Sequence, residues 1–405
     1  MPSDFEGLRS DGSEAAEALV PAVVIRGELN GLGVVRSLAK GHVPTVVVDT
    51  TLRHAAMWSR CSKRHLVDQL SGKPFVESLL RLRHELGPRP VLILTDEMSV
   101  HTVSEYREEL SPHYRFQLPS AEMVSMLSNK ALFQNFAEAH DLTVPRAVIL
   151  ERDSDIADIP DLGMPVIVKP ADKRPVHLGL VERINCLDRM EDAAAACRRM
   201  LRGAGTLVVQ EWIEGRDSSI YFALFHCGPA SRNIFFGRKI AVYPPGLGST
   251  AVCVPAAEAT DLLLPLTERF LDVSGYQGLG SLEFKWDSRA RRFVIIEPTV
   301  GRTDWQEEIA TLNGVNLPLI AYCHEVGLPN PAERATGAAA WRESLFYLRR
   351  CADVSERTYD GYWRGDDPLP AIAFFVDQIV RGSRRLLTRP LLERRKPPFR
   401  RRRIA

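Results

Sequence analysis

An alternation of short apolar runs with helical patterns in the first third of the chain constrains the fold more than any other feature. Each run is four to six residues long and rich in Val or Leu, as expected for a strand. Strands that alternate with helices form parallel sheets covered by helices. We therefore predict a doubly wound α/β unit. Its expected strands are 22–25, 43–48, 91–95 and 114–118.

The chain then becomes richer in strands, after a helical stretch at 120–140. This pattern favours an α+β layer over a second doubly wound unit. The expected strands are 146–150, 166–169, 207–211, 219–225, 234–242, 281–286 and 293–297, and the expected helices lie near 187–202, 258–273 and 306–324. The predicted organisation is a disordered segment 1–18, an α/β unit 19–118, an α+β unit 119–331 and a C-terminal extension 332–405.

Composition and charge narrow the class of protein. Apolar residues make up 45% and charged residues 25%, as in globular proteins and unlike disordered chains. The seven cysteines are scattered and have neither disulfide nor zinc spacing, which favours reduced thiols in the cytoplasm. Apolar runs end near six residues, whereas about 20 are needed to cross a bilayer. We therefore expect a cytoplasmic protein.

The C-terminal segment differs in charge from the rest of the chain. Residues 381–405 contain eleven Lys and Arg against one acid, a charge of +10, so residues 1–380 carry about −9. Apolar residues at helical spacing run from Ile372 to Leu387 beside these cations. Two interpretations stay open, a helix packed on the protein and an amphipathic segment on the inner face of an anionic membrane. No specific nucleic-acid partner is expected.

The glycines near the N-terminus suggest a second possibility. Gly27, Gly31 and Gly33 follow a strand and open a helix, and Asp49 ends the next strand. Such turns hold dinucleotides in NAD-dependent dehydrogenases. The spacing here is G-x-x-x-G-x-G, and Glu28 would lie beside any pyrophosphate. A tight turn without a cofactor is the favoured interpretation, and a dehydrogenase is the alternative.

Candidate phosphate-binding residues stand out because the chain has only nine lysines against 43 arginines. Lys130 begins a predicted helix, Lys169 ends a predicted strand, and Lys239 lies in another. The lysine ammonium is a compact charge suited to phosphate oxygens.

Two further segments complete a nucleotide-binding pattern. Residues 210–217 form an extended stretch with apolar flanks that can hold a purine edge, with a carboxylate a few residues on for ribose. Glu283 and Glu297 end two strands joined by a short turn, so they should meet at one end of the sheet. Paired carboxylates of this kind suit Mg²⁺ bound to nucleotide phosphates.

These motifs, in this order, resemble the ATP-grasp superfamily, and within it the carboxylate–amine ligases near D-aspartate ligase and the carbamoyl-phosphate-synthetase-like group. The resemblance covers about residues 20–325 and implies a Rossmann-like domain followed by an ATP-grasp fold. It also implies ATP and Mg²⁺ as cofactors. The implied nucleotide-binding residues are Lys130, Lys169, Gln210, Glu211, Trp212, Ile213 and Asp217; the metal ligands are Glu283, Glu297 and Thr299; the catalytic residues are Lys239 and Arg302.

Three positions depart from the family pattern. Thr299 stands where the family usually has asparagine, and Val-Gly shifts the arginine one place, to Arg302. The stretch after Lys169 is poor in glycine, so Lys173, Arg174 or His177 would cover phosphates by charge. A catalytically weakened, ATP-binding regulatory protein is therefore a further alternative.

The leading prediction is an ADP-forming ligase that joins a small carboxylate to an amino-acid-like amine through an acyl phosphate. The resemblance suggests a role in cell-envelope, polysaccharide or peptide biosynthesis, and a homodimer is an open expectation.

Overall fold

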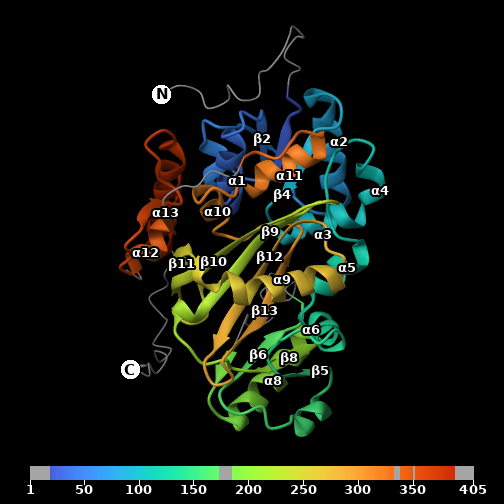
Figure 1. Cartoon of the computed structure of the whole chain (residues 1–405), viewed down its shortest axis with the longest axis vertical. Coiled ribbons are helices and arrows are strands. Elements are labelled where there is room, and N and C mark those ends of the chain that lie inside the picture. The colour runs from blue at the N-terminus through green and yellow to red at the C-terminus, as the bar shows by residue number, and fades with distance from the viewer. Residues whose placement is uncertain (1–18, 173–184, 333–337, 350–351, 388–405) are drawn as a thin grey trace.

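The computed structural model describes residues 19–172, 185–332, 338–349 and 352–387, which form three sheets (Figure 1). The first sheet is parallel, with strand order β3-β2-β1-β4. Strands β1, β2 and β4 are apolar and buried, whereas β3, at one edge of the sheet, is charged and largely exposed. The elements are β1 Ala22–Ile25, α1 Leu29–Ala39, β2 Thr45–Asp49, η2 Ala55–Trp58, β3 Lys63–Leu66, α2 Gly72–Leu86, β4 Val91–Leu94, α3 Glu97–Glu105 and α4 Arg107–Leu110.

The strand expected at 114–118 is wrong. Arg115 makes only an isolated bridge to Val91, and the fourth strand is β3. Tyr114 and Leu118 are buried, so their apolar alternation reflects packing against the core. The sequence of β3, Lys-Arg-His-Leu, lacks the apolar run of a buried strand because β3 lies at the sheet edge.

The second sheet is small and antiparallel, with order β5-β8-β6-β7. It lies at the end of the molecule farthest from the first sheet (Figure 1). The three strands expected here are confirmed, and β7 was not expected. The elements are β5 Ala147–Leu150, η3 Asp153–Asp158, β6 Val166–Pro170, β7 Asn185–Leu187, α8 Met190–Ala204 and β8 Leu207–Glu211.

The third sheet has seven strands in the order β13-β12-β9-β10-β11-β14-β15. The four strands expected in this part of the chain are confirmed, whereas β11, β14 and β15 were not expected. Strand β14 pairs with β11, so part of the predicted C-terminal extension completes this sheet. The elements are η4 Asp217–Ser219, β9 Ile220–Cys227, β10 Arg232–Tyr243, β11 Ser249–Pro255, η5 Ala257–Ala259, α9 Thr260–Ser274, β12 Gly278–Asp287, β13 Arg292–Val300, β14 Ala339–Arg342 and β15 Arg357–Asp360.

Two expected helices are each divided in two. The stretch 120–140 breaks at Asn129, whose side chain accepts hydrogen bonds from the backbone of Ala131 and Leu132 and so starts a new helix at Lys130. The stretch 306–324 breaks at Gly314, which has a positive φ. The resulting helices, with the two that follow in the chain, are α5 Ala121–Ser128, α6 Lys130–Ala139, α10 Glu308–Leu312, α11 Leu317–Val326, α12 Ser344–Arg349 and α13 Leu369–Leu387.

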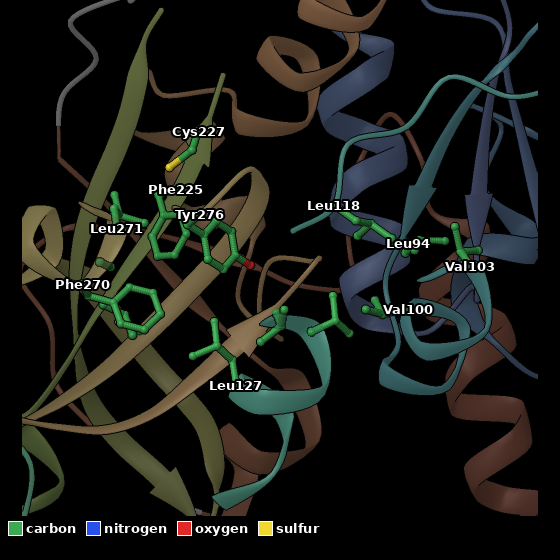
Figure 2. Packing of buried hydrophobic residues seen from close by; sticks show 14 of the residues in the cluster. Leu94, Val100, Val103, Leu118, Leu127, Phe225, Cys227, Phe270, Leu271 and Tyr276 are labelled. Atoms are coloured by element: carbon green, nitrogen blue, oxygen red, sulfur yellow. The ribbon is translucent and has the colours of Figure 1, made fainter. Parts of the chain in front are cut away.

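A continuous apolar core joins the α/β unit to the large sheet. Figure 2 shows Leu94, Val100 and Leu118 of the first unit on one side, and Phe225 and Tyr276 on the other. Because the two units share one cluster of buried side chains, they pack directly against each other. The mixed α/β and α+β fold class is therefore confirmed.

Some expectations lie outside the described residues. These include the disordered N-terminus, the segment 173–184 with Lys173, Arg174 and His177, and the basic residues after Leu387. Among the described residues, no helix is long and apolar enough to cross a membrane.

Candidate active site

A cleft of about 230 Å³ is lined by strands of the second and third sheets. Ten of the twelve predicted site residues line it: Lys169, Gln210, Glu211, Trp212, Ile213, Lys239, Glu283, Glu297, Thr299 and Arg302. Lys130 lines a smaller cavity that shares Lys169, Gln210 and Glu297 with the cleft. The twelfth residue, Asp217, does not line the cleft.

The acidic wall of the cleft is the hairpin β12–β13. Glu283 lies directly opposite Glu297, and Ser281 lies opposite Thr299, so these side chains share one face. The register shifts by one residue between Glu283 and Phe284. Both carboxylates lie on the cleft side, and the pair beyond the bulge, Phe284 and Ile295, belongs to the apolar core.

Two buried lysines face these acids and are held by different partners. Lys169 Nζ donates to Gln210 Oε1 at 2.8 Å, and both residues are buried. Lys239 donates to Glu283 across the sheet. Burial by itself lowers the pKa of Lys239, but the nearby carboxylates of Glu283, Asp304 and Glu297 outweigh burial and raise the pKa. The ammonium therefore stays charged inside the cleft.

The segment expected to hold a purine leads from β8 across the cleft. The Glu211 carboxylate accepts hydrogen bonds from the backbone and guanidinium of Arg146, at 2.8 and 3.0 Å. This pairing occupies the Glu211 carboxylate, so a nucleotide contact of Glu211 stays a prediction. Trp212 and Ile213 supply apolar surface to the cleft.

Asp217 binds backbone N–H groups of the protein rather than lining the cleft. Its carboxylate accepts hydrogen bonds from the backbone N–H of Val242, at 3.1 Å, and of Gly246, at 3.0 Å. It therefore fixes the start of the β10–β11 loop, which lines the cleft from Gly246 to Thr250. A contact between Asp217 and ribose stays a prediction.

Arg302 reaches the cleft in spite of the Val-Gly shift. Gly301 has a φ of 69°, and a Cβ there would lie 2.6 Å from Leu118 Cδ2, so only glycine fits. The Gly301 N–H donates to Tyr276 Oη at 2.9 Å. The extra residue thus forms a fixed turn at the end of β13, after which Arg302 lies on the cleft wall.

Several residues that line the cleft were not predicted as site residues. They include Lys285, Asp304 and Gln306. Gln306 Oε1 accepts from Thr250 Oγ1 at 3.0 Å and so ties the loop after Arg302 to the β10–β11 loop. Lys285 lies two residues beyond Glu283 on the same strand face, so strand alternation could have identified it. Burial lowers the pKa of Lys285, against the opposing effect of Glu283 and Asp217.

The donor set fits a magnesium ion shared with a nucleotide. Within the described part of the chain, no group of three or more His, Cys, Asp or Glu side chains could hold a metal ion. Mg²⁺ typically takes one or two carboxylates and completes its octahedron with water and phosphate oxygens. Glu283 and Glu297 would supply the two carboxylates, and Thr299 would add a hydroxyl.

Protein side chains fill the space around the glycine turn of the α/β unit. Asp49 is fully buried and accepts from Gly27 N at 2.6 Å and Thr50 N at 2.7 Å, and lies 2.7 Å from His54 Nδ1. A Cβ on Gly33 would lie 2.7 Å from Glu307 Oε2. Helix packing and turn geometry therefore account for these glycines, as the favoured interpretation had it.

The fold of the chain is similar to that of several solved structures. No family model matches the chain. Among solved structures, N5-carboxyaminoimidazole synthetase from Staphylococcus aureus has a TM-score of 0.63 at 12% identity, covering 79% of this chain and 81% of that chain. A biotin carboxylase from Campylobacter jejuni has a TM-score of 0.61 at 13% identity, covering 80% and 75%. The chain thus has the ATP-grasp fold, and the predicted resemblance is confirmed.

Sequence comparison finds curated relatives that are named as ligases. A D-aspartate ligase from Enterococcus faecium is 23% identical over 263 residues, which are 60% of this chain and 61% of that protein. A D-alanine–D-alanine ligase from Pseudomonas entomophila is 23% identical over 193 residues, 46% and 58% of the two chains. The chain thus spans about three fifths of the length of these curated relatives.

Proposed function

We propose that this chain is an ATP-dependent, ADP-forming ligase that joins a carboxylate to an amine through an acyl phosphate. The observation that carries the proposal is the cleft, where the facing carboxylates of Glu283 and Glu297 lie among the cations Lys169, Lys239 and Arg302. The names of the relatives support a ligase over a dehydrogenase or a regulator. Solved structural neighbours include complexes with ADP and with MgADP, which supports ATP and Mg²⁺.

The reaction would proceed in two steps, formation of the acyl phosphate and attack by the amine. A substrate carboxylate oxygen attacks the γ-phosphorus of ATP, the bond to the β,γ-bridging oxygen breaks, and ADP leaves with that electron pair. The amine nitrogen then attacks the acyl carbon, phosphate leaves, and the nitrogen loses a proton. Glu283 and Glu297 would hold a magnesium ion, which would supply charge neutralisation at the nucleotide phosphates.

Each group of cleft residues has a role in this scheme. Lys169 and Lys239 neutralise phosphate oxygens, because a buried ammonium binds an anion strongly where water is excluded. Glu283, Glu297 and Thr299 hold the metal. Arg302 stabilises charge on the transferred phosphoryl group and on the tetrahedral oxyanion. Lys130, at the N-terminus of α6, adds positive charge from the neighbouring cavity.

The test is ADP and phosphate release by the purified chain with ATP, Mg²⁺, pooled amino acids and pooled carboxylic acids. We expect release that depends on both a carboxylate and an amine. ATP binding without turnover under every substrate pair would instead support the regulatory alternative. Absence of ATP binding by calorimetry at millimolar ATP and magnesium would overturn the proposal.

We also propose that the C-terminal segment associates with an anionic membrane surface. Six apolar side chains of α13 are between 37% and 68% exposed: Leu369, Ile372, Phe375, Val376, Ile379 and Val380. The opposite face is anchored to the rest of the protein, because Phe374 stacks on Tyr362 and Asp377 pairs with Arg53. An exposed apolar stripe that continues into a segment of charge +10 has the chemistry of an interfacial helix.

Co-sedimentation with vesicles tests the membrane proposal. We expect binding to phosphatidylglycerol vesicles, weak binding to phosphatidylcholine, and loss of binding in Ile379→Glu with ligase activity unchanged. Equal vesicle binding by wild type and Ile379→Glu would overturn the membrane proposal.

We also propose a homodimer, because one structural neighbour is described as a dimer. Light scattering at micromolar concentration tests the oligomeric state.

A further inference from the structure

Three buried lysines line the cleft, and Lys285 differs from the other two. Lys169 has Gln210 as its hydrogen-bond partner, and Lys239 has Glu283. Lys285 is only 6% exposed, yet its ammonium makes no hydrogen bond or ion pair with any residue that the structure describes. Its position in the cleft lining leaves the ammonium accessible to a ligand.

The surroundings of Lys285 compensate its charge only partly. Lys285 lies on β12 between Ile220 of β9 and Val294 of β13. Its Nζ lies 4.3 Å from the centroid of the Trp212 ring. A cation–π contact offsets only part of the cost of burying an ammonium that has no hydrogen-bond acceptor. Lys285 therefore costs the empty protein stability that a ligand acceptor would restore.

The location of Lys285 suggests which part of a ligand it meets. On one side is Trp212, in the segment proposed to hold the purine; two residues along β12 is Glu283, proposed to hold the metal. Two strand residues span about 7 Å, which is close to the separation between a nucleoside and its terminal phosphates. Phosphate oxygens are the strongest acceptors for an ammonium in this interval.

We propose that Lys285 binds the α-phosphate of the nucleotide and so forms part of the ATP subsite. This inference rests on the proposed function, because it assumes a nucleoside triphosphate in the cleft. Lys285 would then give the cleft a third buried cation, placed nearer to the base than Lys239. The alternative acceptor for the Lys285 ammonium is a ring nitrogen of the purine. In that case adenosine, which has no phosphate, would also depend on Lys285.

The test measures binding of ATP, AMP and adenosine, by competition with a fluorescent ATP analogue, to wild type and Lys285→Met. Methionine keeps the volume of the side chain and removes its charge. We expect about tenfold weaker ATP and AMP binding, the size of one charged hydrogen bond, with adenosine unchanged. The melting temperature of the nucleotide-free variant should stay level or rise, because a costly buried charge is gone.

Lys73→Met is the matched control, since Lys73 pairs with Glu109 on the surface of the α/β unit. Lys285→Gln is the second variant and should reproduce the loss. Equal weakening of adenosine would overturn the α-phosphate assignment, as would unchanged ATP binding or a parallel fall in melting temperature and affinity. If wild type itself fails to bind ATP, the proposed function fails; if wild type binds and Lys285→Met binds equally, only this inference fails.

Discussion

The strand ends of the α/β unit and those of the cleft carry similar residue types but differ in what surrounds them. In the α/β unit, Asp49 at the end of β2 is enclosed by Gly27, Thr50 and His54. In the cleft, charged side chains line about 230 Å³ of open space. Charge at a strand end therefore marks a site only where the protein leaves room for a ligand.

The same comparison separates the two nucleotide hypotheses. A dinucleotide at the glycine turn would need donors that Asp49 already occupies and space next to α1 that Glu307 fills. The cleft has cations, carboxylates and an apolar wall around an accessible volume. Substitutions should thus change ligand binding or catalysis in one region and stability in the other.

The largest effect is expected for Arg302→Ala. Arg302 should act on charge that develops during phosphoryl and acyl transfer, so kcat should fall about 10²–10³-fold while ATP affinity stays nearly constant. ADP release and calorimetry on the same preparation measure both. If Arg302 only braces the loop after Gly301, melting temperature and ATP affinity should fall together instead.

Lys169→Met should have the next largest effect. Lys169 is expected to touch ATP in the ground state, so nucleotide affinity itself should fall about 10- to 100-fold, the range for a hydrogen bond to a charged group. The variant also frees the Oε1 acceptor of Gln210, a smaller loss of stability. Unchanged ATP affinity, measured by calorimetry, would contradict the placement of the phosphates.

Much of the fold could be predicted from the sequence, because buried strands carry continuous apolar runs. Strands β1, β2, β4 and β8 are nearly fully buried and were expected within two residues of their bounds. Strand β3 was missed because its edge position allows Lys-Arg-His-Leu. The breaks at Asn129 and Gly314 depend on a cap and a positive φ, which helical periodicity does not reveal.

For the site, the sequence identified residues whose position follows from strand pairing. Glu283 and Glu297 meet because a hairpin sets their register. Lys285 was missed as a site residue since its significance depends on burial and on the absence of an acceptor among described residues, which are tertiary properties. Asp217 was expected at ribose, and its bonds to Val242 and Gly246 come from a loop that the sequence does not place.

Asp49→Asn tests the α/β side of the comparison. The burial of Asp49 raises its pKa, but hydrogen bonds from His54 and the backbone outweigh burial and lower the pKa, so the carboxylate is charged. An amide cannot accept all three donors, and we expect a loss of about 1–3 kcal/mol in the free energy of unfolding. ATP affinity should not change. Asp68→Asn, at an exposed position, is the control, and altered ATP affinity in Asp49→Asn would contradict the comparison.

The smallest effect concerns Glu307, a fully buried acid between α1 and α10. Burial, with the charge of Glu308, raises the pKa of Glu307 to about 8, and its Oε1 lies 3.4 Å from Ser37 Oγ. A raised native pKa means that the folded state holds a proton that the unfolded state releases near pH 4.5. Stability from this group is therefore complete below that pH and is lost as pH rises toward 8. We expect the free energy of unfolding of Glu307→Gln, relative to that of wild type, to be higher at pH 8.5 than at pH 6 by about 1 kcal/mol or more. Denaturant unfolding of both proteins at the two pH values measures this difference. Glu122→Gln, exposed on α5, should keep the wild-type profile; parallel profiles for wild type and Glu307→Gln would mean that Glu307 is ionised in its buried position.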